Sequence, residues 1–210
     1  LVSRDLRLEV NERVAADGEI LKSADEVDFA PIMEKFRENG VETIAIAFMN
    51  AYRNDANEAA ALEKLQALAG DIPVCASTGV VPEKGEFERF STCVLNAYLT
   101  PIISGYLQTL ASELEGQGIS APVNVMGSNG GVMTLDQAAQ FAAGTFLSGP
   151  VGGAGGAVRI CEMAGVDDCI TFDMGGTSTD VALIQNGRAR VRRETFVGDV
   201  RVRAPSVDVR

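Results

Sequence analysis

Strand-like and helix-like patterns alternate along the first third of the chain, and this alternation constrains the fold more than any other feature. Residues 41–49 (VETIAIAFM) are apolar enough for a strand buried on both faces, and residues 72–77 (IPVCAS) form a second short strand pattern. Between them, an alanine-rich helical pattern begins at a capping-box-like Asp55-x-x-Glu58 and ends at Gly70. Strand, helix and strand in succession predict an α/β fold with parallel strands.

The segment before this unit carries two further local signals. Residues 6–21 give two alternating apolar runs around an Asp17-Gly18 turn, which predicts a β-hairpin. Asp28 then precedes a helical pattern that Gly40 ends, so it is expected to cap that helix.

From Gly85 to Glu115 the pattern becomes one long helix. Its large apolar residues recur every three or four positions and predict a single buried stripe: Phe87, Phe90, Val94, Tyr98, Ile102, Tyr106 and Leu110. Pro101 is expected to kink or split the helix. We expect a domain connection here, with an α/β segment in residues 1–85 and the long helix plus a second α/β domain in residues 86–210.

Glycine-rich blocks dominate the second half. Residues 121–134 (APVNVMGSNGGVMT) read as a strand running into a glycine turn, and a short helix is predicted over residues 135–141. Residues 148–165 (SGPVGGAGGAVRICEMAG) then contain four closely spaced glycines, Gly152, Gly153, Gly155 and Gly156, and each costs a helix roughly 1 kcal/mol relative to alanine. Such spacing indicates close approach of another backbone or of a ligand, and both interpretations stay open.

Charge and composition exclude several classes of function. The net charge of −11 argues against a general nucleic-acid surface, and the seven arginines near the C-terminus alternate with small and apolar residues as on the solvent face of a strand. The chain has no histidine, which excludes any mechanism that uses a histidine base.

The cysteines and the hydropathy pattern indicate the compartment. The four cysteines show no C-x-x-C spacing, which argues against a zinc site and favours buried free thiols in a reducing compartment. No apolar run reaches the roughly 18 residues of a membrane span, and the start has no signal-peptide pattern. We therefore expect a cytoplasmic protein.

The segment 170–184 (ITFDMGGTSTDVALI) carries the strongest functional signal. Two β-prone runs flank a loop in which Gly175 and Gly176 allow a tight reversal with positive φ and close approach to an anion. The loop's hydroxyls add donors, and Asp173 and Asp180 can hold a hard cation beside phosphates. The combination predicts a Mg-nucleotide phosphate cradle of neither the P-loop nor the Rossmann type. The competing interpretation is an ordinary hairpin, because turns use the same residues.

The block DMGGTSTDVALI resembles the second phosphate-binding hairpin of the hydantoinase A/5-oxoprolinase family, which also includes the ATP-using subunit of acetone carboxylases. Three further blocks agree in order and spacing: VPEKGEFERFSTCVLNAYLTP, VMGSNGGVMT and FLSGPVGGAGGA. The resemblance implies two ribonuclease-H-like α/β domains of the actin-like ATPase and sugar kinase superfamily, joined here by the long helix and present only in part.

The resemblance also implies what this sequence lacks. Complete members carry an earlier phosphate hairpin and a later glycine-rich nucleotide segment, so the chain is expected to be an internal piece that is inactive in isolation. Family members often have a Ser-His pair where this chain has Ser77-Thr78, which puts any chemistry of that histidine in doubt.

The resemblance further implies ATP and Mg²⁺ as cofactors, a small cyclic amide (hydantoin or 5-oxoproline type) or ketone as substrate, and a second hydrolase or carboxylase subunit as partner. Asp173 would orient the metal and Asp180 would position a water or the attacking group. The expected phosphate donors are Gly175, Gly176, Thr177, Ser178 and Thr179. The turn residues Ser128, Asn129, Gly130 and Gly131 are candidates for substrate or interdomain contact, with a structural turn as the alternative.

Two other functions stay open. A sugar or acid kinase of the same superfamily would use the same hairpin, and a catalytically inactive module of a multi-subunit carboxylase would keep the hairpin without turnover.

Overall fold

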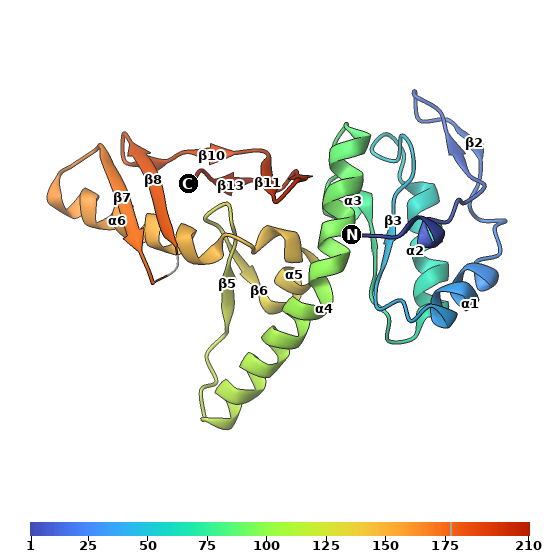
Figure 1. Ribbon diagram of the computed structural model, residues 1–210, viewed down its shortest axis with the longest axis horizontal. Helices are drawn as coiled ribbons and strands as arrows, with labels where there is room; N and C mark the ends of the chain where they lie inside the picture. The colour runs from blue at the N-terminus through green and yellow to red at the C-terminus, as the bar shows by residue number, and fades with distance from the viewer. Residues whose placement is uncertain (177) are drawn as a thin grey trace. The chain divides into compact units, whose positions relative to one another are not determined.

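The computed structural model describes residues 1–176 and 178–210, a mixed α/β chain that divides into two compact units (Figure 1). One unit contains Leu1–Gly105 with Asp199–Val202, and the other contains Tyr106–Gly198 with Arg203–Arg210. The division falls within the long helix α4 (Glu86–Gly116), whereas the segments expected from the sequence, residues 1–85 and 86–210, meet at the start of that helix. No helix in the described part of the chain is long and apolar enough to cross a membrane.

The first unit is built on a parallel pair of strands, as predicted. Its elements before α4 are η1 (Arg4–Leu6), β1 (Arg13–Val14), β2 (Ile20–Lys22), α1 (Ala30–Glu38), β3 (Ile44–Ile46), α2 (Ala56–Ala69), β4 (Val74–Ala76) and α3 (Ser77–Val80). Strands β3 and β4 pair in parallel, with Ile44 opposite Val74. Apolar residues of α1, α2 and these strands form the core, including fully buried Met33 and nearly buried Leu65.

The predicted hairpin is present but shorter than expected. β1 and β2 pair antiparallel, and Gly18 has φ 98° in the turn between them. The chain before β1 is not a strand; it holds the short 3-10 helix η1. Helix α1 is present as predicted, with Gly40 at φ 62° just after it, but its N-cap residue is Phe29. Asp28, one residue before the N-cap, accepts a hydrogen bond from the Ala30 N–H at 3.0 Å.

The prediction for the buried stripe of α4 was wrong. Most of its large apolar members are exposed, with 69% of Phe87, 53% of Tyr98 and 63% of Tyr106 accessible. The buried positions are instead largely polar or small, with two leucines among them: Arg89, Thr92, Cys93, Leu95, Asn96, Ala97 and Leu107. Arg89 explains why a charge can be buried there, because its Nη2 donates to the Phe48 carbonyl at 2.6 Å and its guanidinium pairs with Glu86. The buried face of α4 is therefore set by specific polar partners, which the spacing of apolar residues in the sequence does not reveal.

Pro101 does not split α4. The helix is continuous from Glu86 to Gly116 with Pro101 inside it. A proline removes one backbone donor from the ladder, but the turns on both sides keep their own hydrogen bonds. Figure 1 shows the uninterrupted ribbon of α4.

The second unit combines hairpins with two further helices. Its elements after α4 are β5 (Asn124–Met126), β6 (Val132–Thr134), α5 (Leu135–Gln140), η2 (Ala142–Gly144), α6 (Ser148–Ala164), β7 (Cys169–Met174), β8 (Thr179–Gln185), β9 (Arg188–Ala189), β10 (Val191–Arg192), β11 (Thr195–Val197) and β13 (Ser206–Val207). The short strand β12 (Val200–Val202) belongs to the first unit.

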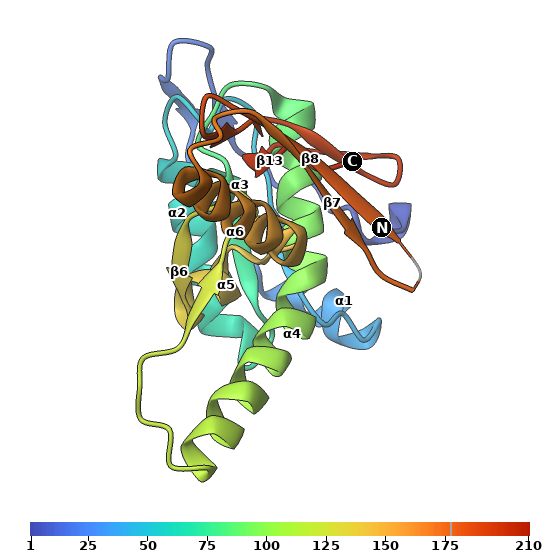
Figure 2. The same ribbon diagram turned by 90° about the vertical axis from the view of Figure 1, so that its left-hand side faces the viewer.

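Helix α6 supplies the core of the second unit. Val151 and Ala154 of α6 pack with Ala182 of β8 and Val207 of β13 in a small buried cluster. Strands β7, β8 and β9 form a three-stranded antiparallel sheet beside this helix (Figure 2). The glycine-rich segment is therefore a packed helix, and it lies next to the hairpin that carries the predicted phosphate site.

The C-terminal arginines are partly paired rather than merely solvated. Arg192 Nε lies 2.7 Å from Asp208 Oδ2, and Arg203 Nη2 lies 2.6 Å from Glu194 Oε1. Each ion pair joins two segments of the C-terminal region. The sequence pattern had predicted these arginines on a solvent-exposed strand face.

Candidate functional site

The predicted phosphate loop lies at the tip of the β7–β8 hairpin. The ladder runs in register from Cys169 opposite Ile184 to Met174 opposite Thr179. Beyond it, the Gly175 N–H donates to the Ser178 carbonyl at 3.0 Å. Thr177, one of the predicted phosphate donors, lies outside the described residues. Gly175, Gly176 and Ser178 therefore lie at the end of the hairpin, beyond the ladder.

The two acidic side chains of the loop are direct cross-strand partners. Asp173 on β7 stands opposite Asp180 on β8, so the two carboxylates share one face of the hairpin. Like charges placed directly opposite destabilise a sheet. Asp173 is exposed and Asp180 is half-buried, which leaves the pair open to a cation that would neutralise it.

The expected positive φ at the glycines is not present. Neither Gly175 nor Gly176 has a φ in the left-handed region. A Cβ added at Gly176 would meet nothing within 4 Å, so the backbone there is open to an approaching group. Ser178 and Thr179 are also exposed.

Helix α6 brings the glycine-rich blocks together. A Cβ built on Gly153 would stand 3.6 Å from Asp173 Oδ2, and one on Gly152 would stand 3.6 Å from Met126 Sδ of β5. At the preceding position, Val151 Cγ1 lies 3.9 Å from a Cβ built on Gly130. Three consecutive residues of α6 therefore approach both the β5–β6 hairpin and the β7–β8 hairpin.

The α6 glycines differ in their surroundings. An added Cβ would be at ordinary van der Waals distance from a neighbouring side chain at Gly152 and Gly153, and would meet nothing within 4 Å at Gly155 and Gly156. The contact between Gly153 and Asp173 could not be found from the sequence, because spacing within a helix does not identify the strand on which it packs.

The second predicted group, at the β5–β6 turn, separates into a buried serine and an exposed tip. Ser128 is fully buried, and its hydroxyl accepts a hydrogen bond from the Leu147 N–H at 3.0 Å just before α6 begins. Its carbonyl accepts from the Val207 N–H at 2.7 Å. Asn129, Gly130 and Gly131 are exposed. Ser128 thus holds the entry of α6 in place, while the rest of the turn is accessible.

The donors present fit a magnesium-bound nucleotide better than a metal held by protein alone. The described residues contain no cluster of three or more side chains able to ligate a metal. Mg²⁺ is usually held by one or two carboxylates, with water and phosphate oxygens completing the shell. Asp173 and Asp180 supply that number of carboxylates on one face of the hairpin.

The capping role that we predicted for Glu58 of the first unit was wrong. Glu58 was expected to complete a capping box at the start of its own helix, but it is fully buried and makes no capping hydrogen bond to α2. Its carboxylate accepts hydrogen bonds from the Phe48 N–H at 2.8 Å and the Ser77 hydroxyl at 2.6 Å. It also accepts from the N–H of Thr78 at 2.9 Å and its hydroxyl at 2.8 Å. Glu58 thereby fixes the chain that follows β3 and β4.

A polar pocket of 320 Å³ lies beside this network. It is lined by Ala51, Tyr52, Arg53, Asn54, Asp55, Thr78 and Pro82. These residues follow the carboxyl ends of the parallel strands β3 and β4, where open α/β sheets place ligands. Thr78, where the resemblance led us to expect a histidine, has its hydroxyl hydrogen-bonded to Glu58.

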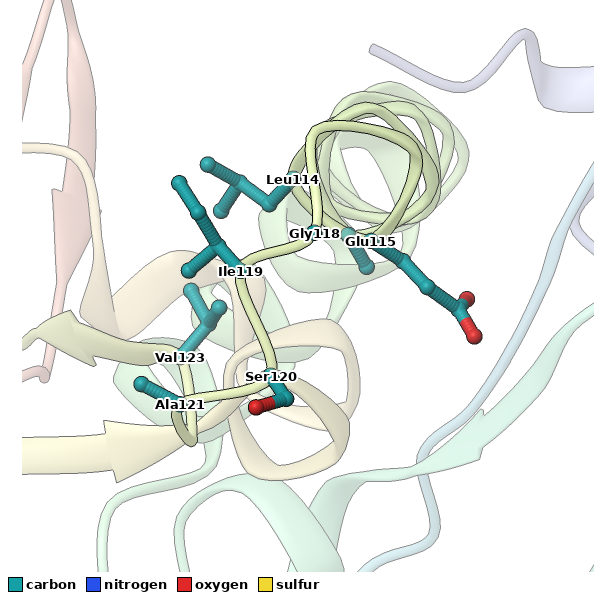
Figure 3. Close-up of a pocket in the computed structure, with 8 residues that line it drawn as sticks. Leu114, Glu115, Gly118, Ile119, Ser120, Ala121 and Val123 are labelled. Atoms are coloured by element: carbon teal, nitrogen blue, oxygen red, sulfur yellow. The ribbon is translucent and has the colours of Figure 1, made fainter.

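A second, mostly apolar pocket of 420 Å³ lies where α4 ends (Figure 3). Leu114 of the last turn of α4 and Ile119 and Val123 of the following chain contribute its apolar wall. None of the predicted site residues lines it. Its chemistry does not extend the phosphate site.

Comparison with protein families matches most of the chain to a single group. The model described as Hydantoinase/oxoprolinase matches residues 89–210, and the model of the Hydantoinase/oxoprolinase N-terminal region matches residues 1–69.

Individual proteins give the same result. Caprolactamase subunit alpha of Pseudomonas jessenii is 32% identical over 209 residues, covering 100% of this chain and 30% of that protein. The 5-oxoprolinase of Saccharomyces cerevisiae is 30% identical over 191 residues, covering 90% of this chain and 14% of that protein. The crystal structure of the ATP-dependent caprolactamase from Pseudomonas jessenii superposes with a TM-score of 0.89 at 31% identity, over 100% of this chain and 30% of that chain. This chain therefore spans less than a third of the length of these relatives.

Proposed function

This chain belongs to the hydantoinase/oxoprolinase family, and from that premise we propose that it supplies a phosphate-binding hairpin to an ATP-dependent enzyme that opens cyclic amides. The substrate would be of the hydantoin or 5-oxoproline type. The observation that carries the proposal is the placement of Asp173 beside Gly153, which puts an exposed carboxylate, an open glycine loop and a glycine-rich helix at one place. We place the fold in the actin-like ATPase and sugar kinase superfamily, with ribonuclease-H-like domains.

ATP would supply the activation that an amide lacks. Resonance stabilises an amide carbonyl, and transfer of a phosphoryl group to its oxygen creates a leaving group that water or a partner subunit's nucleophile can displace. The protein's part in such a reaction is positioning and neutralisation of charge.

Each residue of the hairpin has a role in this proposal. The backbone N–H groups of Gly175 and Gly176 and the hydroxyls of Ser178 and Thr179 donate to phosphate oxygens. Thr177 is assigned to the same group from its position in the sequence. Asp173 holds Mg²⁺ or orients its water, and Asp180 positions a second water or the attacking group.

The β5–β6 turn is assigned to the substrate side of the site. Asn129, Gly130 and Gly131 are exposed where this turn approaches α6, and Ser128 supports them from the interior. A second subunit is the expected partner, because the name caprolactamase subunit alpha implies another subunit in that enzyme. The protein is proposed to work in the cytoplasm, and its four free cysteines agree with a reducing compartment.

The test is Asp173→Asn in the intact protein that contains this chain. We expect loss of Mg-dependent ATP turnover with an unchanged circular dichroism spectrum, because the substitution removes the negative charge and leaves the size of the side chain almost unchanged. Asp71→Asn, which changes an exposed acid of the first unit, is the control and is expected to keep full turnover. Retained turnover in Asp173→Asn would contradict the assignment.

A sugar or acid kinase remains the alternative, because it would need the same hairpin. Stimulation of ATP hydrolysis by hydantoin, 5-oxoproline or a ketone supports the amide or carboxylase chemistry. Stimulation by sugars, with a stable phosphorylated product, supports the kinase. An inactive module would show neither response.

A further inference from the structure

Two of the four cysteines face each other at the end of α6 that lies away from the phosphate loop. Cys161 is in the last turn of α6 and Cys169 is the first residue of β7. Their Sγ atoms lie 3.0 Å apart, within a hydrogen bond. Gly165, with φ 69°, ends the helix and reverses the chain, and the Val166 N–H donates to the Cys161 carbonyl at 2.9 Å. The local backbone therefore holds the two thiols together.

The pair is accessible to a small oxidant. Both side chains are half-buried rather than enclosed. The neighbouring ion pair between Arg159 and Glu162 is at the surface, with 72% of the Arg159 side chain exposed. A reactive cysteine needs this combination of partial exposure and a resolving thiol within reach.

The chain contains its own control for this geometry. Cys75 and Cys93 also lie close, with their Sγ atoms 3.7 Å apart, but Cys93 is fully buried. The pKa of the Cys93 thiol is raised well above its usual value, first by its hydrogen bond to Cys75 and then by burial. Cys75 is half-buried, and the same hydrogen bond lowers the pKa of its thiol, so this pair differs from Cys161 and Cys169 by the enclosure of Cys93, and we expect it to bridge less readily.

We propose that Cys161 and Cys169 are a redox modification site, forming a reversible intramolecular disulfide on exposure to hydrogen peroxide. The Cys161 thiolate attacks one peroxide oxygen; the O–O bond breaks, Cys161 becomes a sulfenic acid, and the hydroxide released takes a proton to become water. The Cys169 sulfur then attacks the Cys161 sulfur, the S–O bond breaks, and a second water leaves with the Cys169 proton. Two thiols lose two electrons in total and one peroxide gains them.

The order of the two steps follows from the environment of Cys169. Its hydrogen bond to Cys161 raises the pKa of the Cys169 thiol, which favours Cys161 as the thiol that reacts first. A thiol that reacts second needs only proximity, which the reversal at Gly165 provides.

The bond would connect two elements that meet again at the phosphate loop. Helix α6 carries Gly153 and strand β7 carries Asp173, so the disulfide would fasten the helix to the strand at their other ends. The inference rests on the cysteine geometry alone and stands whether or not the hairpin binds nucleotide.

The test is peroxide titration of the native chain, followed by alkylation and tryptic mass spectrometry. Trypsin places both cysteines in one peptide, residues 160–188, which would lose two hydrogens and resist alkylation when bridged. Cys75 and Cys93 fall in separate peptides, so a bridge between them would join the two. We expect the 161–169 bridge to form, to exceed any 75–93 bridge by about tenfold, and to be reversed by dithiothreitol.

Three variants complete the test. Cys169→Ser should leave a sulfenic acid on Cys161 that dimedone traps, and Cys161→Ser should form no bridge. The double variant Cys75→Ser with Cys93→Ser should bridge as the unchanged chain does. An unmodified 160–188 peptide at peroxide concentrations that oxidise free cysteine would overturn the proposal. So would bridging mainly between chains, or equal bridging at the buried pair.

Discussion

The Asp173 carboxylate lies against the backbone of α6 at Gly153, where an added Cβ would stand 3.6 Å from Asp173 Oδ2. That distance is ordinary van der Waals contact, so a methyl group fits but a branched side chain does not. Gly153 therefore sets the position of a carboxylate proposed to serve the phosphate site.

Substitution of Gly153 by valine tests this contact. The two methyl groups of valine would push the Asp173 side chain away from α6, and we expect Mg-nucleotide affinity in the intact protein to fall by about tenfold or more. Gly156→Val is the matched control, because it makes the same change in the same helix where nothing lies within 4 Å of an added Cβ. Calorimetric titration of both variants gives the comparison; equal affinities would show that the contact has no role in binding.

Substitution within the cross-strand pair of Asp173 and Asp180 should have opposite effects on the stability of the chain and on its binding of Mg-ATP. Asp180→Asn removes like-charge repulsion across the hairpin and should stabilise the free chain by about 0.2–1 kcal/mol. The same change should weaken binding of Mg-ATP, because one carboxylate near the cation is lost. Urea unfolding without nucleotide and titration with Mg-ATP measure the two effects. A variant that is both less stable and unchanged in binding would contradict the assignment.

Glu58 is expected to be a stability residue of the first unit. Glu58→Ala leaves buried donors of Phe48, Ser77 and Thr78 without an acceptor, at about 1–3 kcal/mol each, so the loss should exceed about 3 kcal/mol. Glu63→Ala, on the exposed side of the same helix, should stay within about 0.5 kcal/mol of the unchanged chain. Urea unfolding followed by circular dichroism measures both. Similar losses in the two variants would mean that the Glu58 network contributes no more than the helix itself.

The carboxyl group of Glu12 should make the free energy of unfolding depend on pH. Burial raises the pKa of its carboxyl above the usual value, despite a hydrogen bond of 2.7 Å from Asn57 Nδ2 that opposes the shift. A raised folded-state pKa means that the folded chain binds this proton more tightly than the unfolded chain. The stabilisation that comes from this bound proton is complete at pH values below the pKa of Glu12 in the unfolded chain. It is lost as the pH rises through the pKa of Glu12 in the folded chain.

Replacement of Glu12 by glutamine should remove this dependence, since glutamine stays neutral and can still accept the Asn57 hydrogen bond. We expect Glu12→Gln to gain stability relative to the unchanged chain at pH 7 and to gain none near the bottom of the carboxyl titration range. Unfolding free energies at both pH values give the difference. A gain of the same size at both would assign the effect to packing instead of ionisation.

Local chemistry was enough to predict many of the elements. Gly18 in the first hairpin, Gly40 after α1 and Asp28 before it act through their own backbone or their immediate neighbours, so their effects can be recognised from a few adjacent residues. The acids, glycines and hydroxyls of the β7–β8 loop can likewise be proposed as a site from the sequence alone, because their chemistry is carried within one short segment.

The tertiary structure decided which side chains are buried and which distant residues meet. From the sequence we could predict an α/β chain and propose a phosphate-binding hairpin, but in the fold Arg89 of α4 is buried and Phe87 is exposed, because the Phe48 carbonyl and Glu86 supply polar partners for Arg89. Glu58 lies in a buried hydrogen-bond network instead of capping its helix, and Gly153 of α6 lies beside Asp173 of β7. Periodicity records only that a residue type suits a helix or strand. Burial and contact depend on the surface packed against that element, which belongs to another part of the chain.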